Sequence, residues 1–195
     1  QQGYFVFWAG KNDLVPAEEG FDEFCDVKYL PPKPVKTFDE MALPWRGGIG
    51  SDNLFSFYYG KIEKDPGAEI YYDGDWAMVL GAIEQIKNAP KDKPLCIYLP
   101  LKYPHPPFMV EEPYYSMIDK SKLLPRIPAP KDWSGKSSML KGVFKNHNLG
   151  GWAEDRWDEL RRTHLGMCAR VDHQAGLVLQ ALKDAGLYDD TAFFF

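Results

Sequence analysis

The sequence predicts an α/β fold with a largely parallel sheet and helices on both of its faces. Short apolar runs typical of strands lie at residues 4–9, 95–99 and 191–195. Two segments with helical periodicity separate them, one over about 73–88 and one over about 152–185. Strands that alternate with helices in this way are expected to run parallel, because each helix carries the chain back across the sheet.

The composition is that of a globular domain. Hydrophobic residues make up 45% of the chain and charged residues 26%, which excludes a wholly disordered or fibrous protein. The net charge is −5, and no block of basic residues is present, so a nucleic-acid partner is not expected. No apolar run approaches the roughly 20 residues of a membrane-spanning helix, so no membrane partner is expected either.

The two ends of the chain favour a fragment. The first strand begins within three residues of Gln1. The last apolar run, residues 191–195, stops on three Phe residues with no turn or charge after them, and an exposed apolar strand invites aggregation. We therefore expect this chain to be a piece of a longer protein. A docked terminal strand is the alternative.

Each helix and the middle strand have identifiable limits. The first helix is predicted to begin at Asp73 or Asp75, either of which can cap it, and to end at Asn88. The run 95–99 does not alternate, as expected for an inner strand covered on both faces. The second helix is predicted to end at Gly186. Its predicted buried stripe consists of Trp157, Leu160, Leu165, Cys168, Val171, Leu179 and Leu182.

The remaining segments are predicted to be irregular. Residues 31–68 show neither helical nor strand periodicity and indicate a long insertion within one domain over 1–195. A Pro-rich loop region is predicted at about 103–150. The cysteines are far apart and odd in number, which favours free thiols in the core over a metal cluster or disulfides. They are Cys25, Cys96 and Cys168.

The turn after the first strand is one candidate site, because ligands of open parallel sheets bind beyond the carboxyl ends of the strands. In the turn Gly10-Lys11-Asn12-Asp13, Lys11 can offer its ammonium to an oxygen of a sulfate, phosphate or carboxylate. Asp13 can hold Lys11 in place or simply cap the next segment. A solvated turn lysine is the alternative reading of Lys11.

A second candidate site follows the middle strand. Prolines restrict the backbone on both sides of His105 in the sequence Tyr103-Pro104-His105-Pro106-Pro107-Phe108. An imidazole held in this way suits proton transfer or hydrogen bonding to an anion. Packing among aromatic residues is the alternative. His164 and His173 lie in the second helix and are expected to be surface or packing residues.

Three stretches, in this order, resemble the sulfatase family of the alkaline phosphatase superfamily. They are residues 3–11, residues 93–108 with Tyr114-Tyr115 beyond, and residues 170–191. The resemblance implies an alkaline-phosphatase-like fold in which Lys11 binds the sulfate oxygens and stabilises charge in the transition state. It implies that His105 contacts the sulfate ester and helps to protonate the leaving group. Asp13 stands where the family often has a second histidine, and a carboxylate there changes the electrostatics beside an anion.

The resemblance also indicates what lies outside this chain. The family's nucleophile is a formylglycine made from Cys or Ser in a Cys/Ser-x-Pro-x-Arg motif, and no cysteine here is followed by that pattern. The family binds a divalent cation, usually calcium, through an Asp-Asp pair near its N-terminus and an Asp-Asn or Asp-His pair after the strand that here ends at Phe195. Asp189-Asp190 precedes that strand and is predicted to form a turn. The implied partners are a sulfate ester and the rest of the parent sulfatase.

The parent protein is therefore expected to hydrolyse sulfate esters, and the 195-residue piece alone is expected to be inactive. A phosphate or phosphonate ester hydrolase of the same superfamily is an alternative, because Lys11 and His105 suit either anion. A third possibility is a non-catalytic binding or structural module whose contact surface is formed by loops 31–68 and 109–150. The sequence leaves the particular ester and the compartment open.

Overall fold

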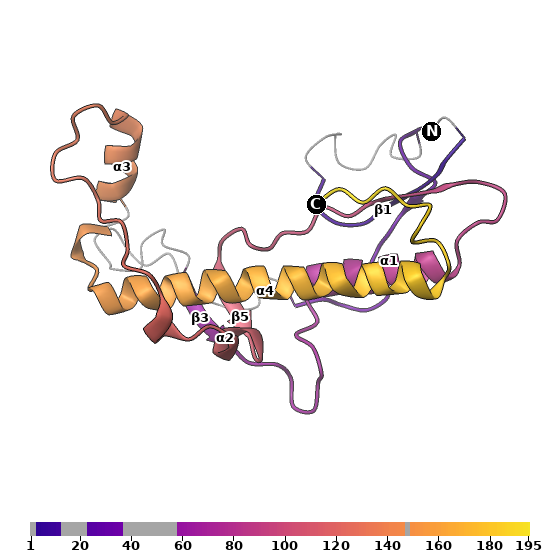
Figure 1. Ribbon diagram of the computed structural model, residues 1–195, viewed down its shortest axis with the longest axis horizontal. Helices are drawn as coiled ribbons and strands as arrows, with labels where there is room; N and C mark the ends of the chain where they lie inside the picture. Colours follow the sequence, from indigo (N-terminus) through magenta and orange to yellow (C-terminus); the bar gives the residue numbers. More distant parts are fainter. Residues whose placement is uncertain (1–2, 13–22, 37–57, 147–148) are drawn as a thin grey trace. The chain divides into compact units, whose positions relative to one another are not determined.

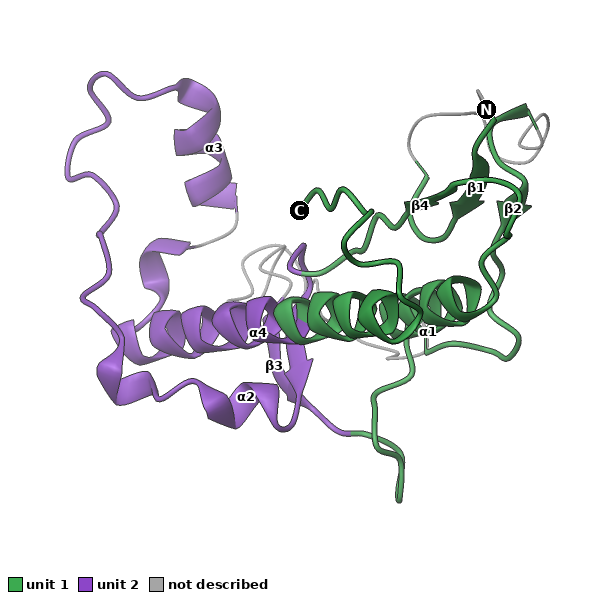
Figure 2. Ribbon diagram, turned by 45° about the vertical axis from the view of Figure 1, so that its right-hand side comes forward, with its two compact units in different colours: residues 1–37, 64–103, 171–195 green, residues 38–63, 104–170 purple. Residues whose placement is uncertain are grey.

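The computed structural model describes residues 3–12, 23–36, 58–146 and 149–195 (Figure 1). The chain divides into two compact units, which Figure 2 distinguishes by colour. Unit 1 comprises residues 1–37, 64–103 and 171–195, and unit 2 comprises residues 38–63 and 104–170. No described helix has the length and apolar character needed to cross a bilayer.

Unit 1 is built on a parallel sheet with the strand order β2-β1-β4. These strands are β1 (Phe5–Trp8), β2 (Val27–Lys28) and β4 (Leu95–Tyr98). Strand β1 is central, with Phe7 opposite Val27 on one side and opposite Ile97 on the other. The α/β class and the parallel arrangement of the strands are thus confirmed.

Two helices cover one face of this sheet. They are α1 (Gly74–Lys87) and the C-terminal half of α4 (Glu154–Asp184), which pack against each other. Val79 of α1 and Val178 of α4 belong to one buried cluster, against which Ile97 of β4 packs. Burial of each such aliphatic side chain contributes about 1.5–3 kcal/mol, so this layer is a main source of the stability of unit 1.

Helix α1 begins and ends where the sequence predicts. The Asp73 carboxylate accepts a hydrogen bond from the backbone N–H of Trp76 at 3.0 Å, so Asp73 is the N-cap. At the other end, the backbone N–H of Asn88 donates to the carbonyl oxygen of Glu84 at 3.1 Å. Asp75, the other candidate for the cap, makes different hydrogen bonds.

Strand β4 differs from the prediction. It lies at the edge of the three described strands of this sheet, and its side chains alternate. Leu95 and Ile97 are partly buried toward the helices, whereas Cys96 and Tyr98 are exposed. The prediction of a strand covered on both faces is wrong here, because an unbroken apolar run does not reveal how many of its faces are covered.

Two further predictions are corrected. Residues 191–195 pair with none of the described strands, and Phe194 and Phe195 are 92% and 91% exposed. A strand needs a hydrogen-bonded neighbour, and these residues lie beside none in the described structure. The prediction of core thiols is correct for Cys25, which is buried, but wrong for Cys96, which is exposed.

Unit 2 contains a two-stranded parallel sheet formed by β3 and β5. Both strands fall in segments predicted to be irregular, 31–68 and 103–150. The sequence does not reveal them because runs of four or five residues are too short to show a clear period. The elements of this unit are β3 (Tyr58–Ile62), β5 (Phe108–Glu111), α2 (Tyr114–Met117), α3 (Ser138–Asn146), the N-terminal half of α4, and single turns of 3₁₀ helix at Lys120–Lys122 and Leu149–Gly151.

A buried ion pair joins α4 to β5 in unit 2. The Arg170 guanidinium donates to the Glu111 carboxylate at 3.2 Å, and the two side chains are 0% and 1% exposed. Burial of either charge alone is costly, so each side chain depends on the other. The predicted stripe of α4 is partly wrong, because Leu165 is exposed and the buried face instead includes Thr163 and Arg170.

The end of β1 is tied closely to the segment after β4. Gly10 has φ +124°, and a Cβ atom at this position would lie 2.4 Å from the carbonyl oxygen of Pro100. The N–H groups of Ala9 and Lys11 donate to the carbonyl oxygens of Tyr98 and Pro100, both at 3.0 Å. Only glycine permits this approach without strain.

Replacement of Gly10 by Ala is therefore expected to destabilise the protein by about 2–4 kcal/mol, from backbone strain and the clash with Pro100. Thermal and urea unfolding measure this change. The matched control is Gly176→Ala in α4, where nothing beyond the adjoining helix backbone lies within 4 Å of the added Cβ and the helix gains about 0.5–1 kcal/mol. Equal stability of Gly10→Ala and wild type would contradict the close approach.

Candidate functional site

Lys11 lies at the carboxyl edge of the sheet of unit 1. It follows β1 by three residues, and its side chain is exposed. Its backbone N–H donates to Pro100, so the turn is attached to the segment that follows β4. This is the edge at which open parallel sheets bind ligands. The predicted position of Lys11 is confirmed, and its role in binding an anion stays a prediction.

Asp75 anchors the segment that leads toward His105. Its side chain lies in the first turn of α1 and is 5% exposed. One carboxylate oxygen accepts the backbone N–H of Lys102 and the other accepts that of Tyr103, both at 2.9 Å. Hydrogen bonds to a charged acceptor are stronger than neutral ones, so Asp75 holds this backbone firmly. The sequence does not reveal this role, because an acidic residue in a first helical turn usually indicates only a cap.

His105 presents one defined ring nitrogen for chemistry. It lies in unit 2, and its side chain is exposed. Nδ1 is 2.6 Å from the carbonyl oxygen of Pro106. Because a carbonyl oxygen only accepts, Nδ1 carries the proton in this contact, and Nε2 is the atom that can exchange a proton with a ligand. In the cationic imidazolium both ring nitrogens carry protons, so Nε2 can then give a proton to a leaving oxygen while Nδ1 still donates to Pro106.

The joint action of the three predicted site residues stays a prediction. Lys11 and His105 belong to different units, so their convergence on one anion stays a prediction. Asp13 lies outside the described residues, and its part in substrate binding also stays a prediction.

Other polar residues from the sequence have structural roles. His164 packs edge-on against Phe108, with 5.9 Å between ring centroids, which confirms it as a packing residue. His173 packs in the same way against Trp76 at 6.0 Å. The pair Asp189-Asp190 forms the predicted turn.

A metal site is not formed by the part of the chain that the structure describes. There, no three His, Cys, Asp or Glu side chains gather closely enough to hold an ion. The described residues thus do not fit the calcium that the resemblance implies.

Two comparisons with known proteins agree with each other. A family model described as Sulfatase matches residues 1–195, the full length of the chain. The chain is also 28% identical over 117 residues to a relative from Trinickia caryophylli, described as the multifunctional alkaline phosphatase superfamily protein PehA. That match covers 53% of the chain but spans only 23% of the relative's length.

Replacement of Asp75 by Asn tests the anchor. An amide group offers only one acceptor and turns a donor toward the N–H of Lys102 or Tyr103, which costs about 1–3 kcal/mol. We expect the exchange of these two amide protons to accelerate about tenfold or more relative to wild type. Amide hydrogen exchange followed by NMR measures this change.

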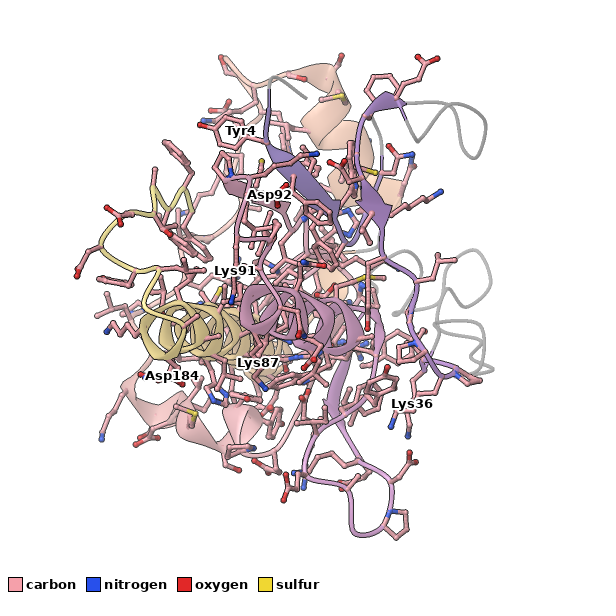
Figure 3. All side chains as sticks on the ribbon, turned by 90° about the vertical axis from the view of Figure 1, so that its right-hand side faces the viewer. Tyr4, Lys36, Lys87, Lys91, Asp92 and Asp184 are labelled. Carbon is pink, nitrogen blue, oxygen red and sulfur yellow. The ribbon has the colours of Figure 1, made fainter. Side chains whose placement is uncertain are left out.

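The matched control for this test is Asp92→Asn, in the exposed loop before β4 (Figure 3), which should change neither amide. Unchanged exchange at Lys102 and Tyr103 in a folded Asp75→Asn variant would show that Asp75 does not anchor this segment.

Proposed function

Because the chain belongs to the sulfatase family, we propose that it forms part of a hydrolase that cleaves sulfate esters. The observation that carries this proposal is the family match over all of residues 1–195. The position of Lys11 supports it, because an ammonium at the carboxyl edge of a parallel sheet suits an anionic ligand.

Lys11 and His105 have complementary tasks in this proposal. Lys11 binds oxygens of the sulfate group and stabilises the negative charge that develops on them. As the nucleophile's oxygen bonds to sulfur, the ester S–O bond breaks and its electron pair passes to the leaving oxygen. That oxygen takes the Nε2 proton of the cationic His105 imidazolium, which is left as the neutral ring with its proton on Nδ1. The nucleophile, a formylglycine, and the divalent cation, calcium or another, come from the parent protein outside this chain.

This function is tested by measuring kcat/KM of the full-length parent for 4-nitrophenyl sulfate and for 4-nitrophenyl phenylphosphonate and comparing the two values. We expect a larger kcat/KM for the sulfate ester. Lys11→Met should lower kcat for that ester about 100-fold, because a charge-stabilising group is lost from the transition state. The 195-residue chain alone, incubated with the sulfate ester and calcium, should release no 4-nitrophenol above the buffer rate.

The other outcomes of this experiment identify the alternatives. A larger kcat/KM for the phosphonate ester would favour a phosphate or phosphonate ester hydrolase, an alternative with which the relative's membership of the alkaline phosphatase superfamily agrees. A parent that hydrolyses neither ester would favour a binding or structural module. Turnover by the isolated chain would contradict the placement of the nucleophile outside it.

A further inference from the structure

Helix α3 of unit 2 is amphipathic and leaves its apolar face exposed. Met139, Leu140 and Val143 are 70%, 51% and 41% exposed, and their spacing places them on one face of the helix. Lys141 and Lys145 lie one turn apart on the adjoining face. An exposed apolar face beside a row of lysines is typical of a helix that binds an external surface.

Local contacts fix the start and one side of α3. The Ser137 hydroxyl caps the helix by accepting a hydrogen bond from the backbone N–H of Met139 at 3.1 Å. The ring of Phe144 packs on that of Trp133, with 5.4 Å between centroids. Phe144 is thus partly covered from within the unit, whereas the other apolar side chains of the helix are left exposed.

Residues 131–146 carry an excess of positive charge. They contain four lysines and a single acid, Asp132, although the whole chain has a net charge of −5. All four lysines are exposed, and none of them forms an ion pair in the described structure. They are Lys131, Lys136, Lys141 and Lys145. This segment therefore favours an anionic partner.

The basic residues that precede this segment are engaged within unit 2. Lys120 pairs with Asp155 at 2.6 Å, and Arg126 pairs with Glu154 at 2.5 Å. The carboxylates at the start of α4 are thus already occupied. A second copy of the chain would offer them to α3 only by breaking these pairs, so the charges do not favour a second copy as the partner.

An anionic lipid surface matches both features of α3. Its headgroups attract the lysines, and the acyl boundary beneath them takes up apolar side chains. A soluble polyanion would pair with the lysines but leave Leu140 and its apolar neighbours in water. We propose that α3, with the loop that precedes it, binds the surface of a membrane rich in anionic lipids. This binding needs neither Lys11 nor His105, so it is independent of the proposed reaction.

Binding to a membrane surface differs from the expectation of no membrane partner. That expectation rests on the absence of a run of about 20 apolar residues, which a membrane-spanning helix requires. A helix bound at the surface requires only one apolar face and nearby positive charge. Trp133 suits the same location, because tryptophan favours the boundary between water and lipid.

Co-sedimentation with vesicles tests this surface, both on the 195-residue chain and on the full-length parent. One set of vesicles contains phosphatidylcholine alone, and the other contains equal parts of phosphatidylcholine and phosphatidylglycerol. At about 0.1 M NaCl, both proteins should partition about 100-fold or more in favour of the anionic vesicles, since each lysine near the surface contributes about a fivefold gain. At about 1 M NaCl most of this difference should be lost.

Two sets of substitutions locate the contact. Lys141→Gln combined with Lys145→Gln should weaken binding to the anionic vesicles about 25-fold, or about fivefold per lysine. Leu140→Gln should weaken it about fivefold, because one apolar side chain no longer enters the lipid. All three positions are exposed, and glutamine is a good helix former, so the variants keep the fold.

The matched controls are Lys87→Gln combined with Lys91→Gln in unit 1 (Figure 3), and Leu165→Gln in α4, where the leucine is 41% exposed. Neither should change the binding. Absence of binding to the anionic vesicles, or equal binding to both sets, would overturn the proposal. So would binding that the α3 variants leave unchanged or that the controls weaken as much. Binding by the 195-residue chain but not by the parent would also overturn it, because another part of the parent would then cover this face.

Discussion

The parallel pairing of β1 with β4 is the constraint on which the candidate site depends. It places the carboxyl ends of both strands at one edge of the sheet, and Gly10 lets the pairing continue as far as Pro100. Lys11 then lies beside the segment that continues toward His105. The Asp75 carboxylate fixes that segment at Lys102 and Tyr103. The backbone position of Lys11 is therefore set by hydrogen bonds, and its side chain is exposed at the edge of the sheet.

The sequence predicts those parts of the fold that local rules determine. The limits of α1 follow from the capping chemistry of Asp73 and Asn88, and the position of Lys11 follows from the turn after a strand. Features set by distant contacts escape prediction. The partner of Arg170 lies 59 residues earlier in the chain, and the pairing of β3 with β5 joins two runs too short to recognise. Which face of β4 is exposed depends on the elements that pack against the strand, and an apolar run does not reveal those elements.

The central claim is that Lys11 and His105 act on the same anion. A crystal structure of the full-length parent with bound sulfate tests it most directly. The account predicts that Nζ of Lys11 and Nε2 of His105 both lie within about 3.2 Å of oxygens of one sulfate ion. A sulfate held by other residues, with these two nitrogens on opposite faces of the protein, would contradict it.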